Sequence, residues 1–248
     1  TEYMASFTSH MITINNHKRL KNYETQSANL PNLEKWDATN TIENPNYFYW
    51  KEYALTNKYT TPQYILTEIE NSKFGFLKGK LGCNLSHQFL LEYLSKHEDK
   101  WHLVCEDDLI INSSTKSENI IFLNELISNI PKQSHFVQLC IYPQFKNKQE
   151  SAKTISTFQA NNITFKIQDK IQQFGTCAYL ISHQACKYMT YRKPWNQNID
   201  FLYNSLDKDF RSVAVVNPYF QCAGSTDKFD NNDNNDNNQF GSLIWNNE

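Results

Sequence analysis

The sequence predicts an α/β fold with a mostly parallel sheet, because apolar patterns of two kinds alternate along the chain. Short apolar runs typical of strands occur at residues 11–15, 101–105, 135–142, 163–168, 176–181 and 213–216. Helix-like patterns lie among them, at residues 81–96, 117–130 and 182–191. Strands separated by helices favour a layered fold built around one sheet.

An apolar run predicts the first strand, and a four-residue spacing of apolar side chains predicts the first of these helices. Residues 11–15 read MITIN, a short apolar run typical of a strand. Leu85, Phe89 and Tyr93 recur every four residues, which places them on one face of a helix over residues 81–96.

The later helices carry recognisable start and stop signals. Ser117 can cap a helix that Pro131 closes, and a third helix begins at another capping residue, Ser182. The apolar face of the helix after Ser117 consists of Ile120, Leu123, Ile127 and Ile130.

Composition argues against several classes of function. A chain of 248 residues with 40% hydrophobic residues can form one large domain with its own core. A net charge of −2 without any Lys/Arg run makes nucleic acid an unexpected partner. No apolar stretch approaches the roughly 20 residues of a membrane span, so we expect a soluble or membrane-peripheral protein. Six cysteines without zinc-type spacing indicate buried thiols in a reducing, cytoplasmic compartment.

The two ends differ in composition from the middle. Residues 9–11 read SHM and resemble an expression-tag scar, so we interpret 1–11 as a tag or leader and 12–226 as a single domain. Residues 227–248 are rich in Asn and Asp and predict a flexible loop and tail. A calcium loop is the alternative, although the Gly and Glu of an EF-hand are missing. The Asn bias resembles proteins of AT-rich genomes, including large DNA viruses, which would place the protein in a host cell.

Three consecutive acids, Glu106, Asp107 and Asp108, follow the apolar strand at residues 101–105. Open α/β sheets bind ligands at the carboxyl ends of their strands, so this position favours a site. In an extended segment Glu106 and Asp108 face one side and Asp107 the other. Two carboxylates on one side suit Mg²⁺ or Mn²⁺, which take oxygen ligands. The alternative is that the acids cap the next turn.

Several segments match the motifs of one known family in the same order. Residues 79–87, GKLGCNLSH, are similar to a G-E-I-G-C-x-x-S-H pattern that precedes an apolar strand ending in E-D-D. Matches to an I-N-L strand with a trailing Arg, to A-x-D-G, to G-T-x-A-Y-x-I-S and to P-x-D occur at residues 14–19, 36–38, 175–182 and 198–200. Together these motifs resemble glycosyltransferase family 25, which includes lipooligosaccharide and procollagen galactosyltransferases.

The resemblance implies a GT-A type glycosyltransferase fold, Rossmann-like, with a mostly parallel central sheet and helices on both faces. It also implies metal-dependent, inverting transfer of a hexose from a UDP-sugar to a hydroxyl of a glycan or hydroxylated protein acceptor. Galactose is the favoured hexose, with glucose as the alternative. Asn16, Asn40, Lys80 and His183 depart from the usual family residues, and these departures concern details of donor and acceptor contact.

The resemblance assigns donor-binding roles to residues at strand ends. Glu106 and Asp108 would hold Mn²⁺ or Mg²⁺ with the UDP diphosphate, and Asp107 would be a further contact. Four residues at the end of the first strand would lie near the base and phosphates of UDP: Ile14, Asn15, Asn16 and Arg19. Simple core packing of Ile14 and a surface position for Arg19 remain alternatives.

Other expected contacts lie in the 36–38 segment and on the 81–96 helix. Asp37 would accept hydrogen bonds from the uridine, and the alternative is an ordinary turn residue. Ser86 and His87 would lie beside the donor, with a buried His bonded only to backbone as the alternative.

The catalytic base implied by the resemblance is Asp200, which matches the late family Asp. An ordinary Asp is ionised near neutral pH and can take the proton of the attacking hydroxyl. The alternative is an N-cap for a helix over residues 201–206.

Two other functions compete with glycosyl transfer. One is a non-catalytic UDP-sugar or glycan-binding protein on the same fold. The other is a metal-dependent phosphohydrolase, which would need further clusters of Asp, His and Asn that the sequence does not show.

Overall fold

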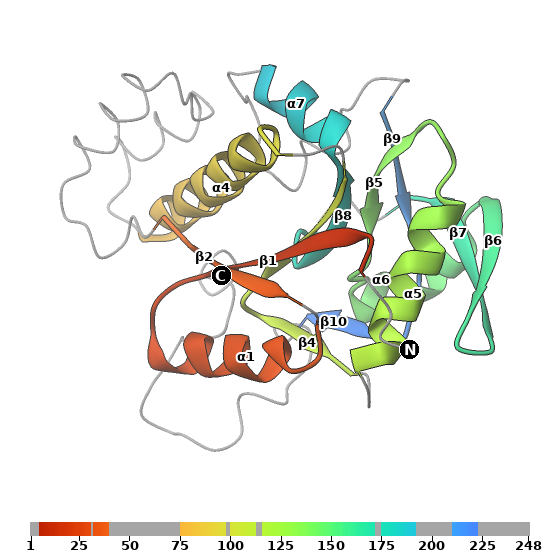
Figure 1. The fold of residues 1–248 in the computed structure, drawn as a ribbon, viewed down its shortest axis with the longest axis horizontal. Coiled ribbons are helices and arrows are strands. Elements are labelled where there is room, and N and C mark those ends of the chain that lie inside the picture. Colours follow the sequence, from red (N-terminus) through yellow and green to blue (C-terminus); the bar gives the residue numbers. More distant parts are fainter. Residues whose placement is uncertain are drawn as a thin grey trace.

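The computed structural model describes residues 5–30, 32–39, 75–97, 100–112, 116–171, 175–191 and 210–222. Within these stretches, one eight-stranded sheet runs through the molecule between helices (Figure 1). In order across the sheet its strands are β2 (Leu33–Asp37), β1 (Phe7–Thr13), β3 (Trp101–Glu106), β8 (Ala178–Ser182), β5 (Ser134–Gln138), β9 (Arg211–Ala214), β7 (Ile163–Asp169) and β6 (Thr154–Ala160). A two-stranded sheet joins β4 (Leu109–Ile111) and β10 (Phe220–Cys222).

Strand direction in the central sheet is mixed. β1 pairs in parallel with β2 and β3, and β5 pairs in parallel with β9. β8 is antiparallel to β3 and β5, and β7 is antiparallel to β9 and β6. The predicted mostly parallel sheet is therefore correct for the direction of most strands, but β8 and β7 run against the others.

The reversal at β7 follows from a two-residue turn. Ala160 pairs with Ile163, and the residues between them, Asn161 and Asn162, have φ of 49° and 62°. Positive φ at both central positions is typical of a type I′ hairpin turn, and Asn tolerates it better than most residues. The hairpin was not predicted, because residues 154–160 are mostly polar and do not form an apolar run.

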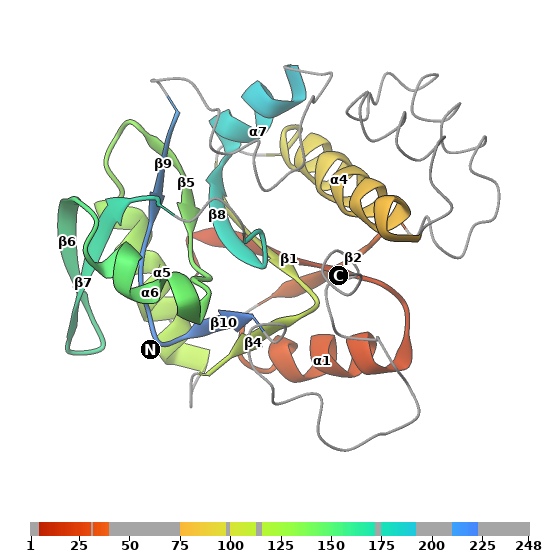
Figure 2. The ribbon, with the colours of Figure 1, turned by 180° about the vertical axis from the view of Figure 1, so that it is seen from behind.

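Alternation along the strands divides the core into two layers. In β3, Leu103 and Cys105 pack on one side of the sheet and Val104 on the other. The first side is covered by α1 (His17–Ser27) and α5 (Lys116–Asn129). The second is covered by α4 (Gly75–Leu94) and α7 (His183–Tyr191), which lie next to each other in Figure 2. The predicted helices on both faces are confirmed.

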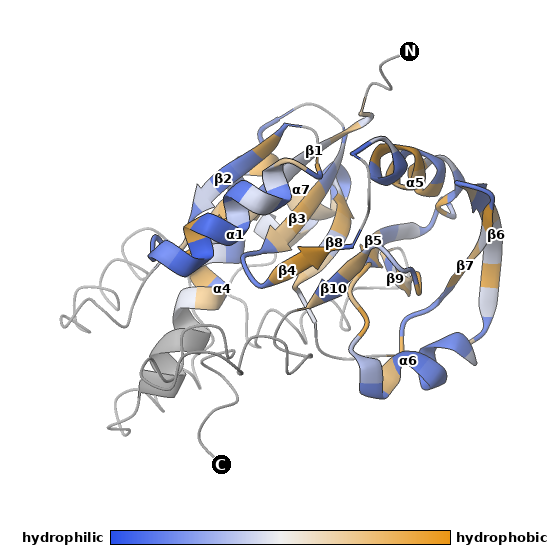
Figure 3. Cartoon of the chain, turned by 90° about the horizontal axis from the view of Figure 1, so that it is seen from below, coloured by the Kyte–Doolittle hydropathy of each residue, from blue (hydrophilic) through white to orange (hydrophobic). Residues whose placement is uncertain are grey.

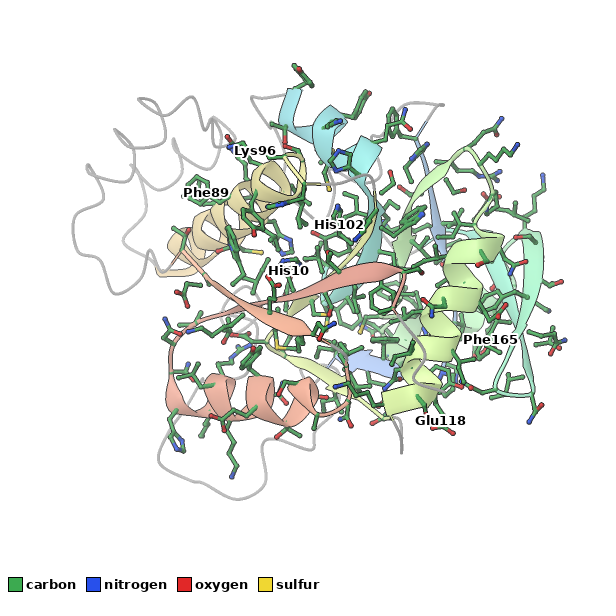
Figure 4. The ribbon with its side chains drawn as sticks, viewed as in Figure 1. His10, Phe89, Lys96, His102, Glu118 and Phe165 are labelled. Atoms are coloured by element: carbon green, nitrogen blue, oxygen red, sulfur yellow. The ribbon has the colours of Figure 1, made fainter. Side chains whose placement is uncertain are left out.

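The helices on the first side are held in different ways. Figure 3 shows α1 as mostly hydrophilic, and the Gln26 side chain on it accepts a 3.1 Å hydrogen bond from the Ile111 backbone N–H. α5 is held by aromatic packing, with ring centroids 4.9 Å apart between Phe122 and Phe165 of β7. Figure 4 shows Phe165 beside α5.

Several element boundaries differ from those predicted. β1 begins at Phe7 and pairs along its length with β3, so residues 7–11, interpreted from the sequence as part of a tag or leader, lie in the central sheet. β5 ends at Gln138, earlier than predicted, and Pro143 begins a short helix, α6 (Pro143–Glu150), soon afterwards. The short strands β4 and β10 were not predicted.

Some sequence predictions lie outside the described residues. These are the base Asp200, the 201–206 helix, Asn40 and the Asn/Asp-rich segment 227–248. No helix in the described part of the chain is long and apolar enough to span a membrane.

Candidate functional site

The carboxyl ends of three parallel strands meet at one edge of the sheet. Ile12 of β1 pairs with Glu106 of β3, and Thr13 pairs with Asp37 of β2. β1 lies between the other two strands, with β2 on one side and β3 on the other. The strand order therefore reverses at β1, and open α/β sheets bind ligands in the crevice at such a reversal. β8 runs the opposite way, so its amino end lies at the same edge, where the Cys177 carbonyl accepts a 2.8 Å hydrogen bond from Glu106 N–H.

Glu106 is the last residue of β3 and faces α4. Its Oε1 lies 3.0 Å from His87 Nε2 and accepts a hydrogen bond from the Thr176 hydroxyl. His87 Nδ1 lies 2.8 Å from the hydroxyl of the buried Tyr179, so both ring nitrogens are engaged. Burial raises the pKa of Glu106. The hydrogen bonds from His87 and Thr176, together with the charges of His87 and Arg19, outweigh burial and lower the pKa overall. Glu106 is therefore a fixed carboxylate that favours the ionised form.

Asp107 faces the opposite side, toward α1. It forms a buried ion pair with Arg19, and its Oδ2 accepts a 2.9 Å hydrogen bond from the Ile14 backbone N–H. Asn22 donates to the Asp107 carbonyl at 2.9 Å, which fixes the turn after β3. Burial raises the pKa of Asp107, and the Arg19 charge opposes that rise. Arg19, expected near the donor phosphates, is thus placed as the partner of Asp107.

Asp108 does not share a side with Glu106 in this structure. It is 8% exposed, and its Oδ2 accepts a hydrogen bond from the Cys222 thiol at 3.1 Å. Its Oδ1 has no hydrogen-bond partner among the described residues. Burial raises the pKa of Asp108 well above its ordinary value. The expected pairing of Glu106 with Asp108 assumed an extended segment, whereas the strand ends at Glu106 and a turn carries Asp108 toward β10.

The acids therefore separate into two groups of metal-ligand type within the described part of the chain. One group contains Glu106 with His87 and Cys83, and the other contains Asp108 with Cys177 and Cys222. In each group one ligand atom of every residue lies within 4.8 Å of the others.

Comparison with known families decides the class of protein to which this edge belongs. Residues 8–203 match the family model described as glycosyltransferase family 25 (LPS biosynthesis protein). This chain belongs to glycosyltransferase family 25. The match spans the ends of β1, β2 and β3, so the family 25 protein has its three acids at the carboxyl edge of a glycosyltransferase domain. A sugar donor and an acceptor are its partners. No curated protein matches the sequence.

At the outer part of the edge, the family 25 protein has a polar network between β1 and β2. Asn15 donates to Asp37 Oδ1 at 3.2 Å and accepts from Lys35 Nζ at 3.0 Å, while Lys35 lies 3.0 Å from the same Asp37 oxygen. The hydrogen bond from Lys35 lowers the pKa of Asp37. Asn15 and Asp37, both predicted as donor contacts, are brought together and exposed to solvent.

Three other predicted residues have local structural partners. Asn16 caps α1, since its side chain accepts from Arg19 N–H at 2.9 Å. The Ser86 hydroxyl donates to the Gly82 carbonyl and accepts from Thr39 N–H at 2.8 Å, so it ties the chain after β2 to α4. The apolar Ile14 is half-buried and contributes its backbone N–H to Asp107.

Sequence reasoning missed several residues of this edge. Thr176 and Tyr179 lie in the G-T-x-A-Y match and hold Glu106 directly or through His87, so that motif was their signal. Lys35 was missed although it lies two residues before Asp37 on β2. The thiols around Asp108 had no spacing signal, because separate segments bring them together.

Carboxylate oxygens at this edge fit Mg²⁺ or Mn²⁺ in chemistry. Glu106 is held by hydrogen bonds at a half-buried position, and Asp108 retains a buried oxygen without a described partner. The chemistry of the two carboxylates therefore fits such a cation, although they lie in separate ligand groups.

Proposed function

We propose that this family 25 protein has a GT-A type fold and transfers a hexose, galactose before glucose, from a UDP-sugar to a hydroxyl of a glycan or hydroxylated protein. The transfer would invert the anomeric carbon and depend on Mn²⁺ or Mg²⁺. One observation carries the proposal: Glu106 is presented at the carboxyl end of β3, beside β1, by a hydrogen-bonded chain from Tyr179 through His87.

The proposed cation would be held by Glu106 and Asp108, and because the two carboxylates lie in separate ligand groups in this structure, Asp108 would have to turn toward Glu106 when the cation binds. Such a cation, when bound, neutralises negative charge that develops on a departing diphosphate. The chain's own contribution is to fix Glu106 in place before the donor arrives, since Thr176 and His87 both contact its carboxylate. A ligand that is already ordered loses less conformational freedom on binding.

We place the uridine at the network of Asn15, Lys35 and Asp37. An exposed Asp with a lowered pKa stays ionised and can accept hydrogen bonds from a ribose or a base N–H. Lys35 would remain close enough to offset the negative charge of the carboxylate and the diphosphate together. The paired polar groups favour recognition of a nucleoside rather than a plain sugar phosphate.

Asp200 remains the proposed base. It would take the proton of the acceptor hydroxyl as that oxygen attacks the anomeric carbon and UDP departs from the opposite face. An ordinary Asp is already ionised near neutral pH, so no special environment is required.

A thermal screen tests donor and metal together. UDP-galactose and UDP-glucose, each with and without Mn²⁺, should raise the melting temperature more with the metal than without it, because a ligand that binds the folded state stabilises it. The Asp200→Asn variant should keep this shift and lose transfer. Equal stabilisation without metal, and no release of UDP, would instead indicate a non-catalytic UDP-sugar-binding protein.

A further inference from the structure

Three cysteine thiols converge on Asp108 from separate segments. Cys140 follows β5, Cys177 precedes β8 and Cys222 ends β10, while Asp108 lies in the turn after β3. The three cysteines are only 1–3% exposed and Asp108 is 8% exposed. Ligand atoms of Asp108, Cys177 and Cys222 lie within 4.8 Å of one another, and Cys140 is hydrogen-bonded to both other thiols. We call these four residues the thiol cluster.

Simple packing does not account for the thiol cluster. A buried free cysteine normally behaves as a small apolar side chain, and apolar neighbours suit it best. A buried carboxyl group costs free energy unless it is fully hydrogen-bonded. Asp108 Oδ2 has a weak thiol donor, and Oδ1 has no partner among the described residues. The cluster therefore has ligand atoms that a cation would satisfy.

The spacing suits a tetrahedral thiolate site. Zinc–sulfur bonds of about 2.3 Å place the sulfurs of a tetrahedron about 3.8 Å apart. That separation is compatible with the 4.8 Å limit within which the Asp108, Cys177 and Cys222 ligand atoms already lie. Cys140 is not in that group, so its thiol would have to move toward Asp108 to complete the tetrahedron. Three thiolates and one carboxylate then leave no open position, which is the arrangement of a structural rather than a catalytic zinc site.

We propose that Asp108, Cys140, Cys177 and Cys222 form a closed site for a thiophilic divalent cation of the zinc class. On binding, each protonated ligand releases its proton to solvent and donates an electron pair to the ion, with no change in oxidation state. The ion would link the turn after β3 to β5, β8 and β10 at the carboxyl edge. Asp108 would bind this ion through Oδ1, the oxygen without a described partner, and loss of the Cys222 proton would free Oδ2 for the donor-site cation.

This site differs in chemistry from the cation site of the proposed function. The donor-site cation takes hard oxygen ligands, whereas three thiols select a soft or borderline ion such as Zn²⁺ or Cd²⁺. The group of Cys83, His87 and Glu106 provides an internal alternative with a single thiol. An ion bound by three thiolates would therefore lie in the thiol cluster, and an ion bound by one thiolate would lie beside Cys83, His87 and Glu106.

Cadmium titration of the reduced 248-residue protein is the test. Cd²⁺ should bind with one equivalent that shows a thiolate-to-metal charge-transfer band of three-thiolate intensity, and excess Mn²⁺ should not displace it. The Cys177→Ser and Cys222→Ser variants should each lose about a third or more of the band and bind more weakly. The Cys186→Ser variant should match the wild type, because Cys186 is a buried thiol on the other side of the sheet.

Two further readouts keep the test decisive. Zn²⁺ should raise the melting temperature of the wild type and of Cys186→Ser, but not that of Cys177→Ser. If a cluster variant fails to fold, the wild-type stoichiometry and band intensity decide. Absence of a thiolate band, or a band of single-thiolate intensity that only Cys83→Ser removes, would overturn the proposal. Neither outcome bears on UDP release, which tests the proposed function separately.

Discussion

His87 Nε2 lies 3.0 Å from Glu106 Oε1, and this contact joins helix α4 to the carboxyl end of strand β3. The other ring nitrogen of His87 is engaged by Tyr179, so the imidazole is held from both sides. His87 thus positions Glu106. His87 is the last residue of the G-C-x-x-S-H motif and Glu106 is the first acid of E-D-D, so this hydrogen bond connects the two motifs directly.

Replacing His87 with Ala should lower UDP release about 10-fold to 100-fold, the range found when outer partners of metal ligands are removed. Glu106 would lose one of its two side-chain donors and become mobile. The concentration of Mn²⁺ that gives half-maximal activity should rise more than KM for the donor. A metal titration of the steady-state rate measures both effects.

The control for this variant is His97→Gln, in the turn that follows α4, where the side chain is exposed. It should keep the wild-type metal response. If His87→Ala also left that response unchanged, His87 would not position Glu106.

Breaking the ion pair between Arg19 and Asp107 should destabilise the fold strongly. Both side chains are about nine-tenths buried, so Arg19→Met leaves an uncompensated carboxylate and should lower the free energy of unfolding by about 3–5 kcal/mol. Urea denaturation measures this change. Arg211→Met is the matched control, because its pair with Asp169 is more than one-third exposed and should contribute about 0–1 kcal/mol. If both variants lost the same free energy of unfolding, the buried ion pair would not contribute more to stability than the exposed one.

Stability should fall in mild acid because of His102. Figure 4 shows His10 and His102 near α4, and burial, with smaller contributions from His10 and His183, lowers the pKa of His102 from 6.5 to about 4. Between pH 6.5 and pH 4, His102 is therefore protonated in the unfolded chain but neutral in the folded chain. His102 contributes stability above pH 6.5 that is lost as pH falls toward 4, about 3 kcal/mol in total.

Unfolding free energies measured between pH 7 and pH 4 test this dependence. His102→Asn, which retains a polar atom near the Thr8 hydroxyl, should flatten the profile. His135 also has a lowered pKa from burial and should leave a smaller residual slope. A profile that does not change in His102→Asn would contradict the assignment.

Asp37→Asn should weaken UDP binding without unfolding the protein. The exposed carboxylate is paired with Lys35 and Asn15, so its loss should change stability by less than about 1 kcal/mol. Calorimetric UDP affinity should fall about 10-fold, the effect of about 1.4 kcal/mol. Glu118→Gln, on the distant helix α5, is the charge-matched control. Unchanged affinity in Asp37→Asn would remove Asp37 from the uridine site.

The parts of the fold predicted correctly are those with long, regular patterns. The four-residue spacing of Leu85, Phe89 and Tyr93 identified α4, and the apolar run before Glu106 identified β3. β4 and β10 have three residues each, too few for a period to be recognised. The antiparallel direction of β8 depends on long connections, about which local patterns carry no information.

The candidate site was predictable only where a strand led directly into it. Glu106 could be placed at the sheet edge because a buried strand ends there. The direction of the Asp108 side chain could not be predicted in the same way. A turn begins after Glu106, so side chains no longer alternate between the two faces of the sheet. The thiols that surround Asp108 come from segments up to 114 residues away from it, and no spacing rule connects them.

Glu106 is central to this account, and UDP release from UDP-galactose with saturating Mn²⁺ tests it most directly. The wild type should release UDP, Glu106→Gln should reduce the rate at least about 100-fold as expected for loss of a charge-stabilising group, and Glu125→Gln on the exposed face of α5 should not. Glu106→Gln turnover equal to that of Glu125→Gln would contradict the assignment of the metal and donor site to the end of β3.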